Sequence, residues 1–225
     1  MKKLIYIILL FVTLCGPSFS AVVKLDFIEG NWLSSDDIRS QSGNLLTGKY
    51  QPPAKPLLEY RTYMVFNSPG FTEQITSVRF ISGLAESTQN GTLSVYSIET
   101  NLNILRDGNR CLFNSCLDIY NDLGDGHLYG SSEIDLISDT QADLLLSDIN
   151  IINLVANGGM FAIGLQYESN GYILGGFGVV PDPYPFIEVT TVPIPGAIVL
   201  LSSALFFLFP ALKRIREPTI NRANI

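Results

Sequence analysis

The chain has 225 residues, of which 47% are hydrophobic, and its 14 Lys and Arg against 21 Asp and Glu give a net charge of −7. The imbalance is concentrated in residues 21–191, which contain eight basic and twenty acidic residues, a net charge of −12. A surface this acidic repels nucleic acid and anionic lipid, so DNA- and RNA-binding roles are excluded. It is compatible with divalent cations, neutral glycans or simple solubility.

The N-terminus has the pattern of a secretory signal peptide over residues 1–20. Two lysines precede an apolar run at 4–14, and small residues surround the bond between Ser20 and Ala21, where we predict cleavage. Eleven helical residues rise only about 16 Å, against roughly 30 Å for the hydrocarbon core of a bilayer, which argues against an uncleaved anchor. Cys15 follows a leucine, whereas a lipoprotein signal needs a small residue there.

Short strands separated by turn residues are predicted over most of the next region, residues 21–191. One stretch has a helical period instead, from Ser147 as a candidate N-cap to Gly158, and predicts one short helix. The proline-rich segment 52–56 predicts a loop. These elements are typical of a mainly β, antiparallel β-sandwich, which we expect to be jelly-roll-like. The predicted strands lie at 22–28, 60–66, 75–81, 91–98, 160–167, 171–177 and 185–189.

Aromatic side chains offer a possible sugar-binding surface within this region. Trp32, Tyr129, Tyr172 and Tyr184 are candidates for stacking against sugars if they are exposed. The alternative is that the tyrosines pack within the sheets, since strands favour Tyr and Phe for packing, and that Trp32 covers a sheet end.

Cys111 and Cys116 are the cysteines that remain once a signal peptide is removed. In an exported protein this pair predicts a small disulfide loop, worth roughly 2 kcal/mol on the chain-entropy estimate. A zinc site is the rival interpretation, but two cysteines and the single His127 fall short of a four-ligand set. A redox-active pair more often has the Cys-x-x-Cys spacing.

Three aspartates, Asp118, Asp122 and Asp125, lie close together beside two glycines. Oxygen-rich turns bind Ca²⁺ in some proteins, but no EF-hand spacing is present, and Asp-Gly is also the ordinary dipeptide of a tight turn. We therefore expect no cofactor and keep the three aspartates as weak calcium candidates. His127 is the only histidine. Because no nucleophile motif accompanies it, we expect a surface loop residue rather than part of a Ser-His-Asp site.

The C-terminus combines a proline motif, an uncharged apolar run and a basic cluster. Seventeen helical residues span roughly 25 Å, within the lower range for a transmembrane helix. Basic residues stay on the cytoplasmic side, which predicts an external domain and a cytoplasmic tail. The motif is Val192-Pro193-Ile194-Pro195-Gly196, the helix is 196–212, the basic residues are Lys213, Arg214 and Arg216, and the tail is 217–225.

This arrangement, over residues 192–216, resembles the PEP-CTERM sorting signal of Gram-negative bacteria. The resemblance implies a membrane-anchored precursor whose helix is removed by an exosortase-type enzyme, with delivery to the cell envelope or the extracellular matrix. It also implies an association with exopolysaccharide and biofilm formation. A permanent single-pass anchor is the alternative.

The sequence therefore predicts an exported, non-enzymatic envelope or matrix protein with four parts: a signal peptide, a β ectodomain, a sorting signal and a short tail. The expected partners are the membrane, the processing enzyme and exopolysaccharide, with no nucleic acid. A carbohydrate-binding module and a polysaccharide hydrolase are the alternatives.

Overall fold

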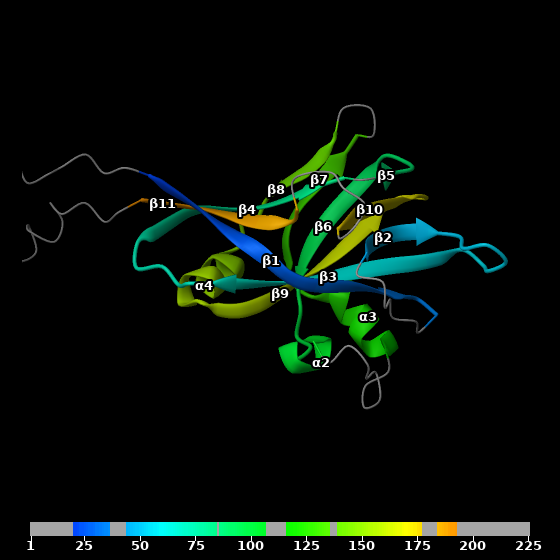
Figure 1. The fold of residues 1–225 in the computed structure, drawn as a ribbon, viewed down its shortest axis with the longest axis horizontal. Helices are drawn as coiled ribbons and strands as arrows, with labels where there is room; N and C mark the ends of the chain where they lie inside the picture. The colour runs from blue at the N-terminus through cyan, green and yellow to red at the C-terminus, as the bar shows by residue number, and fades with distance from the viewer. Residues whose placement is uncertain are drawn as a thin grey trace, which may run out of the picture. The chain divides into compact units, whose positions relative to one another are not determined.

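The computed structural model describes residues 20–36, 44–84, 86–106, 116–135, 139–176 and 184–192 (Figure 1). A compact unit spans Ala21–Thr191. Strands account for 56% of the structure, and the helices are few and short.

The elements of the described residues alternate irregularly between strands and three short helices. The strands are β1 (Ala21–Ser34), β2 (Asn44–Tyr50), β3 (Leu58–Ser68), β4 (Gln74–Gly83), β5 (Glu86–Ser87), β6 (Gly91–Ser97), β7 (Leu128–Ile134), β8 (Gln141–Leu145), β9 (Gly159–Glu168), β10 (Tyr172–Gly176) and β11 (Phe186–Val192). The helices are α2 (Leu102–Arg106), α3 (Cys116–Asp125) and α4 (Ile149–Asn157).

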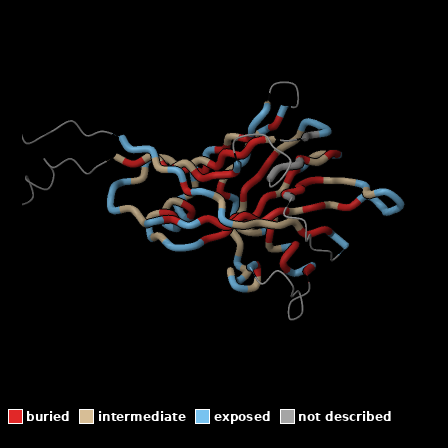
Figure 2. Tube along the Cα trace, in the orientation of Figure 1, coloured by how far each residue is buried: buried red, intermediate tan, exposed pale blue. Residues whose placement is uncertain are grey.

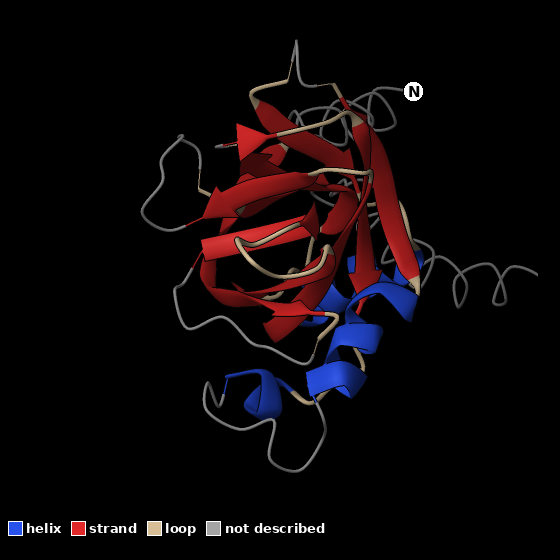
Figure 3. Cartoon of the chain, turned by 90° about the vertical axis from the view of Figure 1, so that its right-hand side faces the viewer, coloured by secondary structure: helices blue, strands red, loops and turns tan. Residues whose placement is uncertain are grey.

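The strands form an antiparallel sheet that curls round until its two ends nearly meet. Hydrogen-bonded neighbours follow the order β7–β6–β9–β3–β1–β11–β4–β8. β8 then returns beside β7, and the backbone N–H of Ser147 donates to the carbonyl of Tyr129. Strand β1 pairs with a different neighbour along each part of its length. Ala21–Asp26 pair with β11, and the rest of the strand pairs with β3. The result is a nearly closed antiparallel barrel with its helices outside the strands (Figure 3).

A smaller group of strands branches from β3. The first residues of β3, Leu58–Tyr60, pair with β2, whereas Thr62–Ser68 pair with β9. Beyond β2 lies β10, and beyond β10 lies the two-residue β5. Figure 1 shows the β2–β3 hairpin reaching to one end of the unit, and Figure 2 shows that its connecting loop is exposed.

The main hydrophobic core fills the interior of the barrel (Figure 2). Phe66 of β3 and Phe80 of β4 are completely buried, and Phe66 stacks on Phe161 with 5.8 Å between ring centroids. Helix α4 adds Ile151 and Val155 to the same core. The alternating pattern of β3 also directs side chains to the opposite face, where they form a second cluster.

The second cluster lies between the outer face of β3 and helices α2 and α3. Tyr63 and Val65 of β3 pack there against Leu105, Ile119 and Leu123. The Tyr63 hydroxyl donates to the carbonyl of Leu105 at 2.7 Å. These helices are therefore held to the barrel by burial of one apolar face.

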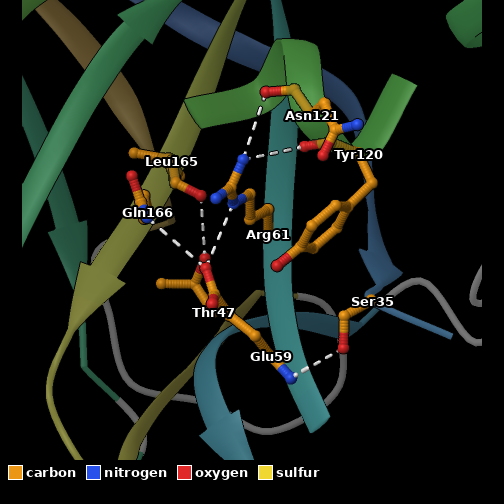
Figure 4. A network of polar contacts seen from close by, with 8 residues as sticks. All are labelled: Ser35, Thr47, Glu59, Arg61, Tyr120, Asn121, Leu165 and Gln166. Carbon is orange, nitrogen blue, oxygen red and sulfur yellow. Dashed lines mark hydrogen bonds and ion pairs between the residues drawn. The ribbon is translucent and has the colours of Figure 1, made fainter. Parts of the chain in front are cut away.

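Arg61 adds a polar attachment between β3 and α3 (Figure 4). Its guanidinium donates to the backbone carbonyls of Tyr120 and Asn121 at 3.2 and 3.1 Å, and lies over the Tyr120 ring at 4.4 Å. The same group donates to Glu59 at 3.2 Å, and Gln166 donates to that carboxylate at 3.4 Å. Arg61 thus connects α3 with β3, and Glu59 extends the network to β9.

The prediction of a mainly β, antiparallel fold is confirmed, as is the loop at 52–56, which lies between β2 and β3. The predicted helix is confirmed as α4, but its N-cap is Asp148 rather than Ser147, because the Asp148 carboxylate accepts from the N–H of Asn150 at 2.7 Å. The prediction of a single helix is wrong, since α2 and α3 are also present.

Several sequence predictions lie outside the described residues. They include Cys111, the predicted signal peptide up to residue 19, and the predicted sorting signal beyond Val192 with its predicted membrane helix at 196–212. Within the described ranges, none of the helices is long and apolar enough to cross a membrane.

We expect replacement of Arg61 by methionine to lower the free energy of unfolding by about 2 to 3 kcal/mol, because two carbonyl bonds to a charged group are lost. Arg79 is the matched control, since its ion pair with Asp143, at 2.5 Å, joins two half-exposed side chains. Arg79→Met should cost less than about 1 kcal/mol. Urea denaturation of both variants measures the difference, and equal losses would contradict the role given to Arg61.

Candidate functional site

The β2–β3 hairpin and its neighbours place a set of aromatic side chains on one face. Across β2 and β3, Tyr50 lies opposite Leu58 and Gly48 lies opposite Tyr60. On the two flanking strands, Ser34 of β1 lies opposite Tyr60, and Tyr172 of β10 lies opposite Gly48. Residues directly opposite in an antiparallel pair share a face of the sheet, so four strands contribute to one surface.

Four aromatic rings make contact on this face. The rings of Trp32 and Tyr60 meet edge to face, with 5.0 Å between centroids, and those of Tyr50 and Tyr172 do the same at 5.0 Å. Tyr50 also contacts Tyr60 at 6.2 Å. Contacts of this geometry contribute about 0.5–1.5 kcal/mol each beyond the area they bury. Tyr60 is buried, whereas the other three rings keep part of their surface exposed.

Gly48 is required for this packing. Its φ of +106° is rarely adopted by other residues, and a Cβ atom would lie 2.5 Å from the carbonyl oxygen of Gly171 and 2.9 Å from the Cα of Tyr172. Glycine therefore lets β10 approach β2 closely enough for Tyr172 to reach Tyr50.

A pocket with a volume of about 290 Å³ opens among these side chains. This size is close to the lower end of the range for small-molecule pockets, and a mostly apolar wall with a few polar groups is the usual lining. We call it the aromatic pocket. It is lined by Trp32, Ser34, Asp36, Leu46, Tyr50, Pro52, Lys55, Leu58 and Tyr60.

One ion pair lies at the aromatic pocket. The ammonium group of Lys55 is 3.7 Å from a carboxylate oxygen of Asp36, and the Ser34 hydroxyl donates to the other oxygen. Burial, the negative charge of Asp36 and the neighbouring Tyr50 together raise the pKa of the Tyr60 hydroxyl above its ordinary value. The pocket thus combines aromatic rings with one carboxylate and one ammonium group.

The opposite face of the hairpin carries a polar cleft with a volume of about 580 Å³. Lys49 and Glu59, which lie opposite each other across β2 and β3, line it together with Gln166 and Glu168 of β9. Glu59 already accepts hydrogen bonds from Arg61 and Gln166. This cleft is hydrophilic, in contrast to the aromatic pocket.

Neither a protein-family model nor a curated protein matches this chain.

The structure brings together two of the four aromatic residues proposed as sugar-stacking candidates. Trp32 and Tyr172 join the aromatic cluster, whereas Tyr129 is buried in the main core and Tyr184 is exposed outside the pocket lining. Sequence reasoning missed Tyr50, because the strand that carries it was not predicted. It also missed Asp36 and Lys55, which meet only through the pairing of β1, β2 and β3.

The three calcium candidates lie on helix α3 and not in a Gly-rich turn, so that part of the interpretation is wrong. Both oxygens of Asp122 accept hydrogen bonds, from the backbone N–H groups of Glu99 and Thr100. Across the described ranges, no cluster of three metal-ligating side chains is present. Calcium binding by Asp118, Asp122 and Asp125 remains a prediction.

Cys116, at the start of α3, is disulfide-bonded. Its predicted partner Cys111 lies outside the described residues, so the pairing remains a prediction. At the predicted processing sites, Ala21 begins β1 and pairs with Thr191 of β11, directly before Val192.

His127 lies before β7 with its side chain exposed, as expected for a surface residue. Its Nε2 atom is 2.6 Å from a carboxylate oxygen of Asp148, the N-cap of α4. The bond from His127 and then that from the N–H of Asn150 lower the pKa of Asp148 below its ordinary value. The contact links β7 to α4.

We expect the pKa of Asp148 to rise in the variant His127→Ala, because its main hydrogen-bond donor is removed. A depressed folded-state pKa means that the Asp148 carboxylate stabilises the fold above its unfolded pKa, about 3.9, and that this contribution is lost as the pH falls through the folded pKa. Carboxyl ¹³C NMR titration of the two proteins measures the shift. An unchanged Asp148 pKa in the variant would contradict the pairing.

Proposed function

We propose that this chain is an exported, non-enzymatic envelope or matrix protein whose β domain binds exopolysaccharide in the aromatic pocket. The observation that carries the proposal is the pair of partly exposed rings, Trp32 and Tyr50, that line a pocket of about 290 Å³, with Tyr172 packed against Tyr50. The C–H face of a sugar ring packs on an aromatic face, while its hydroxyls need polar partners at the edge. Ser34, Asp36 and Lys55 supply such partners.

Export and display are proposed from the sequence patterns at the two ends. The predicted signal peptide (1–20), the sorting motif beginning at Val192 and the basic cluster support a precursor anchored in the inner membrane, with transfer to the envelope surface or matrix. The compact unit at Ala21–Thr191 fits between these segments. As part of the same proposal, the β domain is jelly-roll-like.

The charge of the domain supports a glycan partner rather than a nucleic acid, because the net charge of −12 over residues 21–191 repels polyanions. The proposal is non-enzymatic because Asp36 is the one carboxylate among the described residues that line the aromatic pocket. Hydrolysis would need two carboxylates placed across the bound sugar chain.

We expect Trp32→Ala and Tyr50→Ala to weaken retention on the exopolysaccharide of the producing cells about tenfold, because each removes a ring that lines the pocket. Tyr184→Ala is the matched control and should bind like the unaltered domain, since Tyr184 is exposed but outside the pocket lining. Affinity electrophoresis measures the retention, and the length of the polymer should stay unchanged after incubation. Equal retention of all three variants, or shortened polymer, would contradict the proposal.

We expect the mature protein, purified from its native envelope, to begin at Ala21 and to end between Val192 and Pro195. Intact-mass measurement distinguishes this processed form from the precursor. A chain that still ends at Ile225 would indicate a permanent anchor, and the exosortase part of the proposal would then be dropped.

A further inference from the structure

The aromatic pocket has the chemistry of a cation site as well as that of a sugar site. Trp32, Tyr50 and Tyr60 surround it, and the carboxylate of Asp36 lies among them. An ammonium group is attracted to the negative faces of aromatic rings, most strongly where it is partly removed from water. A carboxylate beside the rings adds a charge-assisted hydrogen bond to the same group.

The negative charge of Asp36 affects the buried side chain of Tyr60. That charge is one of the causes, after burial, that raise the pKa of the Tyr60 hydroxyl. Asp36 also lines the same pocket as the rings, so one ligand there can contact both. The net charge of −12 over residues 21–191 also attracts a cationic polymer and repels an acidic one.

The chain already holds one ammonium group at this position. The Nζ atom of Lys55 is 3.7 Å from Asp36, which is longer than the 2.7–2.9 Å of a good charge-assisted hydrogen bond. The side chains of Lys55 and Asp36 are 46% and 33% exposed, so the pair is screened by water and weak. A ligand ammonium can replace Lys55 at little cost.

The backbone around Lys55 is fixed more firmly than its side chain. The N–H of Lys55 donates to the carbonyl of Pro52 at 3.1 Å, and the Gln51 side chain donates to the Lys55 carbonyl at 3.2 Å. Lys55 therefore stays near Asp36 in the free protein and competes with any cation that enters.

We propose that the aromatic pocket binds a protonated amino sugar of the polysaccharide, with Asp36 as its counter-ion and Lys55 as an internal competitor. This inference rests on the proposed glycan-binding function and names the class of sugar. It distinguishes a partly deacetylated, amine-bearing polymer from neutral and uronic acid polymers.

The test compares fully deacetylated and fully acetylated chitin oligosaccharides of equal length, with Trp32 fluorescence as the readout because Trp32 is the only tryptophan in the chain. We expect about tenfold tighter binding of the deacetylated oligosaccharide at a pH where its amines are protonated. This preference should fall when the amines are neutral and when salt is raised.

Asp36→Asn should remove the preference, because the counter-ion is lost and binding of the deacetylated oligosaccharide falls to the level of the acetylated one. Lys55→Gln should strengthen binding of the deacetylated oligosaccharide about threefold, because the competitor is gone. A gain of affinity cannot result from misfolding, so this variant guards against a trivial loss in Asp36→Asn. Glu73→Gln is the matched control for Asp36→Asn. It also removes one negative charge, but at an exposed position outside the pocket lining.

The results distinguish a failure of the glycan-binding function from a failure of the amino-sugar inference. If neither oligosaccharide, nor the native polysaccharide, changes the fluorescence, the glycan-binding function itself is wrong. If both bind equally and Asp36→Asn has no selective effect, the glycan function stands and the amino-sugar inference is overturned. If spermidine competes as well as the deacetylated oligosaccharide, the site recognises amines without the sugar, which also overturns it.

Discussion

Strand β3 is the element on which the rest of the structure depends, because it supplies side chains to all three hydrophobic clusters. Met64 and Phe66 point into the barrel, while Tyr63 and Val65 point to the helices. Tyr60, nearer the start of the strand, belongs to the aromatic cluster. Packing of completely buried residues such as Phe66 leaves no room for a change of register, since a slip of one residue would move every side chain to the opposite face.

The position of the aromatic pocket follows from the unequal pairing of this strand. Strand β9 pairs with β3 only from Thr62 onward, and β2 takes its place at Leu58–Tyr60. One edge of β3 thus pairs with β2 near its start and with β9 further on. The aromatic face forms where β1, β2, β3 and β10 meet. Ring contacts hold Trp32, Tyr50 and Tyr172 in place while part of each ring stays accessible. Rigid rings on a rigid sheet lose little conformational entropy on binding a ligand.

The local pattern of apolar and polar residues was sufficient to predict helix α4 but not helix α3. The helix α4 could be predicted because its apolar residues recur at helical spacing and Gly158 ends it. Helix α3 was mistaken for turns because its aspartates and Gly124 suggest a loop. Its stability comes from tertiary packing of Ile119 and Leu123 on β3 and from Arg61, neither of which local propensity contains.

In the candidate site, too, some residues could be predicted from the sequence, whereas others depend on tertiary structure. Trp32 and Tyr172 could be named as sugar-stacking candidates from residue type alone, but alternation could not tell them from Tyr129, which packs in the core. The pocket itself depends on the register of three strands, β1, β2 and β3, which brings Asp36 to Lys55. No residue spacing within a single segment of the sequence predicts that Asp36 and Lys55 lie close together.

The proposed function depends most directly on a sugar occupying the aromatic pocket. The chain has one tryptophan, so a ¹⁵N-labelled domain gives one indole N–H signal in a ¹H–¹⁵N correlation spectrum. Titration with the native polysaccharide, cut to short oligosaccharides, should shift this signal and the amide signals of Tyr50 and Tyr172, while those of the main core around Phe80 stay in place. An indole signal that does not move while signals elsewhere shift would show that the glycan binds at another surface and would contradict the account.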